Sequence, residues 1–240
     1  MRGRWKAVSA AAVVSLLFFG CKRYTPVEKG FAPEVSSIYV AEDGTIFSAT
    51  VEDCGTDRYS SEGLEAFVTE EVARYNESLG YPAAEPAADQ DREGREKKSR
   101  DRESEPNLPV TVVSCQVTDG KATAIYQYLD SASFLAFAES YHDDANRLRS
   151  LGTGSASSGR VQGWFEDGEY VKPGGQSGEV QPAQKEELDR LNKERMLLVE
   201  TSHPVTIQTE GTICYMTRDV ELSGEDVALV PAGKHYIVFK

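Results

Sequence analysis

Residues 37–52 read SIYVAEDGTIFSATVE, two runs rich in β-branched and aromatic residues on either side of an Asp-Gly pair. Apolar and polar residues alternate within each run, which predicts two strands that each turn one face toward a core. Asp-Gly between such runs is the strongest short-range signal for a β-hairpin, because the turn needs backbone with positive φ. The stretch therefore predicts an antiparallel hairpin, and the fold begins there.

A helix is predicted directly after this hairpin. Ser60 and Ser61 can cap its start, and Gly80 before Pro82 can end it, which gives a helix over residues 62–79. Apolar residues recur at helical spacing on one face, namely Leu64, Phe67, Val68, Val72, Tyr75 and Leu79.

The same order of elements recurs further along the chain. Strands are predicted at 110–117 and 122–128 around a second Asp-Gly pair, followed by a helix capped by Asp130 or Ser131. The apolar face of that helix comprises Phe134, Phe137, Ala138, Tyr141, Ala145 and Leu148. The recurrence predicts an α+β fold over residues 36–151, built from duplicated ββα units whose antiparallel hairpins carry helices on one face.

Three segments differ from these units in composition. Residues 82–108 are dominated by alanine, proline and charge of alternating sign, which predicts a solvated, disordered insertion. Residues 152–159 are glycine and serine rich and predict a flexible linker. Residues 161–171 hold a third Asp-Gly pair and predict an aromatic hairpin.

The rest of the chain is predicted to be mainly strand. A surface helix is expected over residues 182–194, because i,i+4 charge pairs dominate it. Five strands are expected after it, at 196–199, 205–208, 212–216, 227–230 and 235–239. The part from 152 to 240 either forms its own unit or shares one core with residues 36–151.

The N-terminus has the layout of a secretory signal. Three cations precede an uncharged apolar run over residues 7–19, so residues 1–20 are predicted to be a signal peptide. Gly20-Cys21 resembles the lipobox of bacterial lipoproteins, with Phe18 where leucine is usual. That resemblance implies lipidation of Cys21 after cleavage, and the alternative is an ordinary signal with an incidental cysteine. Residues 21–35 are predicted to be a flexible tether.

The acidic net charge of the chain restricts the classes of partner that it can bind. The formal net charge of the chain is −13, and removing a signal with three cations and no acid takes it to −16. Such a chain repels nucleic acid and anionic membrane surfaces, so nucleic acid is excluded as a partner and the membrane is reached only through the lipid on Cys21. Cations and basic proteins are the partners that fit the charge.

Cysteines and histidines provide no catalytic motif. Cys54, Cys115 and Cys214 form an odd set, which permits at most one disulfide, and Cys115 is predicted to be a small buried residue. The sequence contains no Gly-x-Ser-x-Gly, phosphate-loop, Cys-x-x-Cys or His-Glu-x-x-His motif. The three histidines are His142, His203 and His235, and nothing in their spacing requires a metal site with Asp143 and Asp144. No catalytic residue, metal or cofactor is predicted.

The aromatic residues Trp164, Phe165 and Tyr170 are candidate contacts for a protein or glycan partner. Aromatic side chains on an exposed loop between glycine-rich stretches are typical of such surfaces. The alternative is that Trp164 and Tyr170 pack into the sheet.

Residues 37–46, 59–64 and 205–240, behind the lipobox, resemble uncharacterised cell-surface lipoproteins of clostridial Gram-positive bacteria. The resemblance covers most of the chain after residue 20, apart from the insertion and the glycine-serine stretches. It implies lipid anchoring on the extracytoplasmic face of the cell membrane and carries over no activity. We therefore expect a non-enzymatic binding or assembly module. The alternatives are a cell-wall hydrolase with an unrecognised carboxylate site, and an inhibitor or accessory subunit of a membrane complex.

Overall fold

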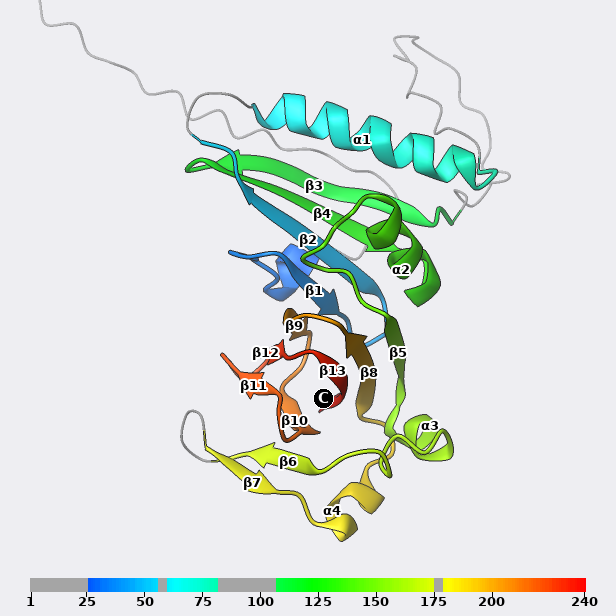
Figure 1. Ribbon diagram of the computed structural model, residues 1–240, viewed down its shortest axis with the longest axis vertical. Coiled ribbons are helices and arrows are strands. Elements are labelled where there is room, and N and C mark those ends of the chain that lie inside the picture. The colour runs from blue at the N-terminus through cyan, green and yellow to red at the C-terminus, as the bar shows by residue number, and fades with distance from the viewer. Residues whose placement is uncertain (1–25, 56–59, 82–106, 175–178) are drawn as a thin grey trace, which may run out of the picture.

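The computed structural model describes residues 26–55, 60–81, 107–174 and 179–240. It contains helices and two β-sheets, so the predicted α+β class is confirmed. The described body is elongated, with helix α1 at one end and helix α4 at the other (Figure 1).

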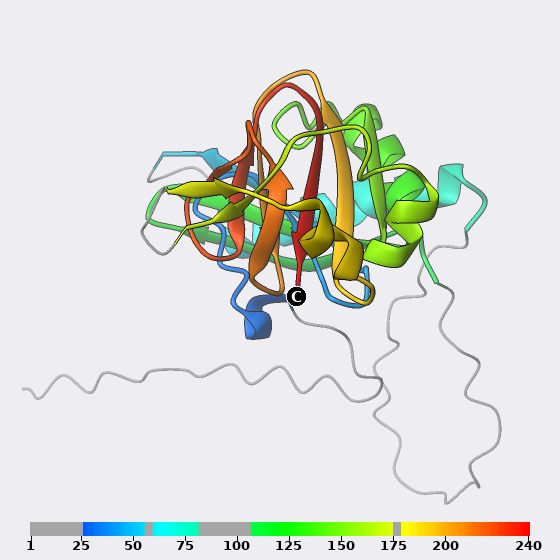
Figure 2. The ribbon, with the colours of Figure 1, turned by 90° about the horizontal axis from the view of Figure 1, so that it is seen from below.

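The larger sheet, called sheet A, has seven strands in the order β11-β12-β9-β1-β2-β4-β3. Its strands are β1 (Ser37–Val40), β2 (Ile46–Asp53), β3 (Val110–Thr118), β4 (Lys121–Tyr128), β9 (Val205–Thr209), β11 (Glu221–Leu222) and β12 (Val227–Val230). Sheet B has six strands in the order β5-β8-β13-β10-β6-β7, and Figure 2 shows β13 between β8 and β10. Its strands are β5 (Ser150–Ser155), β6 (Tyr170–Pro173), β7 (Val180–Pro182), β8 (Arg195–Thr201), β10 (Ile213–Thr217) and β13 (Gly233–Phe239). The helices are η1 (Pro26–Lys29, 3-10), α1 (Ser61–Ser78), α2 (Ser131–Ser140), α3 (Ala156–Val161) and α4 (Lys185–Arg190).

The first two predicted hairpins are confirmed. β1 pairs antiparallel with β2, and Gly44 adopts φ +93° in the loop between them. β3 pairs with β4 through Asp119 (φ 51°) and Gly120 (φ 77°), two consecutive positive values that match the turn type favoured between twisted strands. β2 also pairs with β4, so the two hairpins form one continuous half-sheet.

Helix α1 begins as predicted, with the Ser60 side chain accepting a hydrogen bond from the Gly63 N–H. The predicted apolar face is only partly correct. Val68, Val72 and Tyr75 are buried, whereas Phe67 is 61% exposed and Leu79 is 51% exposed. The reason is that α1 packs mainly against β3, the edge strand of sheet A, so only a narrow stripe of the helix is covered (Figure 1).

Side chains of α1 hydrogen-bond to the edge strand at both of its ends. Asn76 Nδ2 donates to the Val110 carbonyl (2.9 Å) and Asn76 Oδ1 accepts from the Val110 N–H (3.3 Å). Ser61 Oγ accepts from the Val117 N–H (2.9 Å) at the other end. The helix therefore covers backbone groups that an open sheet edge would expose.

The order strand-strand-helix occurs twice, but the duplication is not confirmed. α1 follows the first hairpin and packs on the second, at β3 and β4. α2 follows the second hairpin and packs on β3, β4 and β5, beside α1. The two helices thus occupy different positions relative to their own hairpins.

All five C-terminal strands are confirmed, and the short strand β11 is an addition. β9 pairs in parallel with β1, with Ile38 opposite Ile207, so the C-terminal part completes the N-terminal sheet. The main core accordingly combines residues from both parts of the chain, from Ile38 to Phe239.

The predicted linker at 152–159 is wrong, because these residues form the end of β5 and the start of α3. Their glycines provide room for a large neighbour. A Cβ at Gly152 would lie 3.0 Å from the Trp164 ring, and one at Gly159 would lie 2.5 Å from Met196 Sδ. Small residues here permit close packing rather than flexibility.

Three other predictions also need correction. Residues 161–171 do not form a hairpin, because α3 is followed by turns and β6 pairs with β7 and β10 instead. The helix expected over 182–194 spans only Lys185–Arg190, since β7 continues to Pro182. The described part of the tether predicted at 21–35 is packed rather than flexible: Pro26–Lys29 forms helix η1, and Phe31 is fully buried against Tyr39 (ring centroids 5.0 Å apart). The signal peptide, Cys21 and most of the predicted insertion lie outside the described residues.

Candidate functional site

A cavity of about 550 Å³ lies where α1, strands β2 and β4, and the loop after α2 meet. Its apolar lining includes Val51, Leu64, Phe67, Val68, Val72, Ala122, Ala124, Tyr126, Phe137 and Tyr141. Its polar lining includes Ser36, Thr50, Glu52, Glu71, His142, Asp143 and Asp144. The cavity exists because α1 packs along the edge strand β3 of sheet A. This placement leaves a wedge-shaped space between the helix and strands β2 and β4.

Stacked aromatic rings form the wall on the α2 side. The Phe137 and Tyr141 rings stack with centroids 4.5 Å apart, and the Tyr126 ring lies 5.3 Å from that of Phe137. The Tyr141 hydroxyl donates to the Glu71 carbonyl of α1 (2.7 Å), which ties the loop to the helix. The wall is therefore held in position from two elements.

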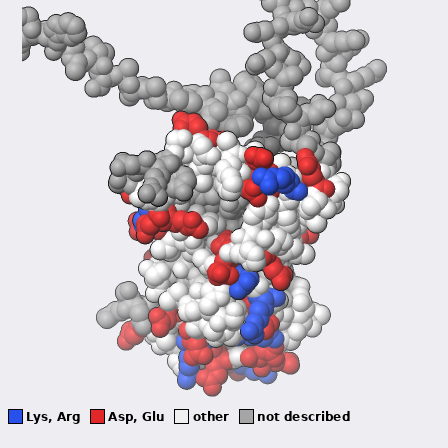
Figure 3. Space-filling view, turned by 45° about the horizontal axis from the view of Figure 1, so that its top comes forward, with Lys and Arg blue, Asp and Glu red and all other residues white. Residues whose placement is uncertain are grey.

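The polar groups at the cavity are largely carboxylates. Asp143 Oδ2 accepts hydrogen bonds from Thr50 Oγ1 (3.0 Å) and Asn146 Nδ2 (2.9 Å), and its Oδ1 accepts from the Asn146 N–H (3.3 Å). Asn146 is itself 1% exposed, so this carboxylate has a fixed orientation. Figure 3 shows acidic side chains in several patches on one face of the molecule.

The loop that carries Asp143 contains a strained residue. His142 has φ 51°, a left-handed conformation that favours glycine. It occupies the position after the C-cap of α2, where the His142 and Asp143 N–H groups donate to the Glu139 and Ala138 carbonyls. Histidine at this position costs conformational energy relative to glycine.

The hydroxyl and thiol groups near the cavity stay protonated at neutral pH. Burial, and then the nearby Cys115 and Asp143, raise the pKa of Tyr126. Burial also raises the pKa of Tyr141, and burial together with Glu65 raises the pKa of Cys115 to about 11. These groups can therefore donate hydrogen bonds but are poor nucleophiles.

The aromatic residues singled out from the sequence pack against sheet B, away from this cavity: Tyr170 belongs to β6, and Trp164 and Phe165 lie in the turns between α3 and β6. Trp164 and Tyr170 are each 6% exposed, and the Tyr170 hydroxyl donates to the Trp164 carbonyl (2.8 Å). Trp164 lies beside Tyr236 (ring centroids 6.1 Å apart), and Phe165 is half-buried against Tyr170. Trp164 and Tyr170 thus follow the core-packing alternative, which leaves only Phe165 partly accessible for a partner.

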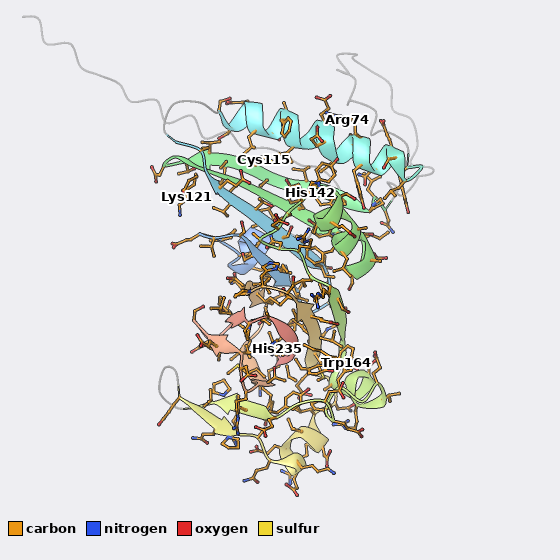
Figure 4. All side chains as sticks on the ribbon, in the orientation of Figure 1. Arg74, Cys115, Lys121, His142, Trp164 and His235 are labelled. Carbon is orange, nitrogen blue, oxygen red and sulfur yellow. The ribbon has the colours of Figure 1, made fainter. Side chains whose placement is uncertain are left out.

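The histidines do not converge. His142 lies at the cavity, whereas His235 is buried in β13 with Nδ1 3.2 Å from Thr217 Oγ1 (Figure 4). His203 Nε2 is 3.4 Å from the Ala145 carbonyl, beside the same loop as His142. In the part of the chain that the structure describes, no group of three or more His, Cys, Asp or Glu side chains could hold a metal ion. Cys54, Cys115 and Cys214 are free thiols.

The sequence predicts none of the cavity residues as a site. Asp143 and Asp144 attract attention only as neighbours of His142, and Phe67 is expected in the core. An apolar residue at the margin of a helix face, such as Phe67, is a weak signal, because the sequence does not show how much of that face the sheet will cover.

The described helices include none long and apolar enough to cross a bilayer. The cavity and its fixed carboxylate stand as the candidate site on geometry alone. Comparisons with protein-family models, curated proteins and solved structures found no match for this chain.

Proposed function

We propose that the protein is a lipid-anchored surface protein that acts as a non-enzymatic binding module, with the cavity beside α1 as its ligand site. The observation that carries the proposal is the cavity itself, whose volume of about 550 Å³ falls in the range typical of small-molecule sites. Apolar walls with a few placed polar groups are the usual composition of such sites.

The site is organised before any ligand arrives. Asp143 is held by Thr50 and Asn146, and Tyr141 is tied to α1. A site whose groups are already in place loses less conformational entropy on binding.

The anchor is proposed from the lipobox at Gly20-Cys21 and from the resemblance to clostridial surface lipoproteins. The described residues begin at Pro26, and Phe31 is fully buried against Tyr39, so four residues, 22–25, lie between Cys21 and the described fold. Five peptide steps span at most roughly 17 Å. A lipid on Cys21 would therefore keep the η1 side of the molecule close to the membrane.

Mass spectrometry of the protein's mature N-terminus tests the anchor. We expect an acylated cysteine at position 21 as the first residue. An unmodified N-terminus at or after Cys21 would contradict the anchor and would leave the binding site unaffected.

Ligand-observed NMR with a library of small aromatic and aliphatic compounds tests the site. The chain from Lys22 to Lys240 serves here, because it keeps every described residue. We expect hits that weaken on Phe67→Ala, a change at a side chain that is 61% exposed. Leu79→Ala is the matched control, since Leu79 is similarly exposed at the C-cap of the same helix and is not among the residues that line the cavity. Hits that are insensitive to Phe67→Ala would place binding elsewhere.

A cell-wall hydrolase is the second candidate, because the described residues that line the cavity include the carboxylates Glu52, Glu71, Asp143 and Asp144. Hydrolysis of a glycosidic bond would require a pair of these groups as acid and base. Release of soluble fragments from purified cell wall, abolished by Glu52→Gln or Asp143→Asn, would favour this candidate over the binding module.

A further inference from the structure

Among the described residues that line the cavity, the charged or ionisable side chains other than Tyr126 and Tyr141 are carboxylates and one histidine. Glu71 and Asp144 already form ion pairs, with Arg74 (2.6 Å) and Arg147 (3.1 Å). Among the described residues, no lysine or arginine forms an ion pair with Glu52 or Asp143. Within this part of the chain, Glu52 and Asp143 thus have no cationic partner.

These two carboxylates lie at the same end of the cavity. Asp143 accepts a hydrogen bond from Thr50 on β2 (3.0 Å), and Glu52 is two residues further along the same face of that strand. Burial raises the pKa of Tyr126 on β4, and the charges of Asp143 and Glu52 add smaller shifts in the same direction. Uncharged donors orient Asp143, so its negative charge is fixed in place rather than neutralised.

Apolar surface adjoins this negative end. Phe67 is 61% exposed at the helix side, and Leu64, Val68 and Tyr126 continue the wall. Aromatic faces attract organic cations as well as apolar groups. A bare metal ion would gain nothing from such walls, and the described residues contain no cluster suited to one.

We propose that the cavity binds a small organic cation, with its apolar body against α1 and β4 and its ammonium or guanidinium group toward Glu52 and Asp143. This inference rests on the proposed binding function and names the ligand class. The volume of about 550 Å³ accommodates a small molecule and not a folded partner.

The test uses three probes that share one apolar body: 2-naphthylmethylammonium, 2-naphthylmethanol and 2-naphthoate. Affinities are measured by calorimetric or NMR titration at pH 8 and low salt, with the chain from Lys22 to Lys240. We expect the cation to bind about tenfold more tightly than the alcohol, and the anion more weakly still, as for one charge pair near a protein surface. In high salt the three affinities should converge, because exposed charges are screened.

Two variants, each with a matched control, test which residues produce the preference for the cation and which contact the apolar body of the probes. Glu52→Gln should reduce the preference for the cation over the alcohol severalfold, whereas Asp53→Asn, which points to the opposite face of β2, should leave it unchanged. Phe67→Ala should weaken the binding of all three probes, and Leu79→Ala should change none of the three affinities. Both Glu52 and Phe67 are exposed, so circular dichroism should show folded variants.

The possible results distinguish a failure of the proposed ligand class from a failure of the proposed binding function on which it rests. Equal affinity for the cation and the alcohol, both sensitive to Phe67→Ala, would overturn the ligand class and keep the binding module. Absence of binding by all three probes would overturn both. A cation preference that survives Glu52→Gln would place the charged group elsewhere and would also overturn the inference.

Discussion

Two aromatic regions of this protein differ in how far their side chains are buried. Around Trp164, which packs against sheet B, the aromatic rings contact one another, and the Tyr236 hydroxyl and Lys234 both donate to Asp167. Beside α1, Phe67 stays exposed and Asp143 faces a cavity. Both regions are rich in aromatic side chains, so aromatic content alone does not mark a binding surface. What differs is how closely the neighbouring elements approach.

Glycine permits the close approach in the first region. Gly152 and Gly159 let β5 and α3 pack directly on Trp164 and Met196. In the second region α1 packs on an edge strand and leaves the central strands β2 and β4 uncovered at one end. The comparison therefore predicts that equivalent truncations will have very unequal effects on stability.

The largest effect is expected from truncating one ring in each region. Trp164→Ala should lower the free energy of unfolding by about 3–5 kcal/mol, because it removes a buried side chain and leaves a hole. Phe67→Ala should change it by less than about 0.5 kcal/mol, since most of that ring is exposed. Urea unfolding followed by circular dichroism measures both, and similar losses would show that the two regions do not differ as described.

The second largest effect on the free energy of unfolding is expected at β3, the edge strand of sheet A that α1 covers. Asn76→Ala removes both hydrogen bonds to Val110 and should lower the free energy of unfolding by about 2 kcal/mol, because buried backbone groups lose their partners. Glu70→Ala, at an exposed position on the same helix, is the control. If the two variants were equally stable, the hydrogen bonds between Asn76 and Val110 would contribute nothing measurable to the free energy of unfolding.

A gain in stability is expected at the cavity loop. His142→Gly should raise the free energy of unfolding by about 1 kcal/mol, because glycine adopts the left-handed conformation of residue 142 without the cost of a Cβ. His142→Ala is the control, since alanine keeps that cost and should bring no gain. If both variants are stabilised equally, the backbone at this position is not strained.

The smallest effect is electrostatic and belongs to the closed region. Hydrogen bonds from Lys234 and Tyr236 lower the pKa of Asp167 below its ordinary value of 3.8. Because the folded pKa is the lower one, the stabilisation is complete above pH 4 and disappears as the pH falls through the folded value. The same pair raises the pKa of Lys234, so at alkaline pH stability is lost only above its ordinary value of 10.5.

Asp167→Asn tests this dependence. The difference in stability between wild type and variant should be constant from pH 5 to pH 9 and should shrink below pH 4. Urea unfolding across this range measures the difference. A difference that persists unchanged below pH 4 would show that the carboxylate charge contributes nothing.

Local signals predicted most of the secondary structure. Asp-Gly pairs at 43–44 and 119–120 produce hairpins because the flanking runs alternate and can pair locally. The same pair at 167–168 does not, because β6 pairs with the distant strand β10 and the run before it joins α3. Likewise, the glycine-serine run at 152–159 has the composition of a linker, and only its neighbours show that small side chains are required for packing.

The candidate site could not be predicted in this way. Thr50, Phe67, Tyr126 and Asp143 come from four segments of the chain, and no spacing in the sequence connects them. The residues that were predicted as contacts, Trp164 and Tyr170, are buried because sheet B closes over them.

The sequence by itself determined the first two hairpins, the five predicted C-terminal strands, the start of α1 and the acidic charge, since each depends on neighbouring residues or on composition. Only the tertiary structure decided where α1 lies, which aromatic rings are covered and which carboxylates share a cavity. These features depend on contacts between residues such as Asn76 and Val110, or Thr50 and Asp143, that are far apart in the chain. Long-range packing sets the width of the gap between two elements, and that width separates a closed core from a binding site.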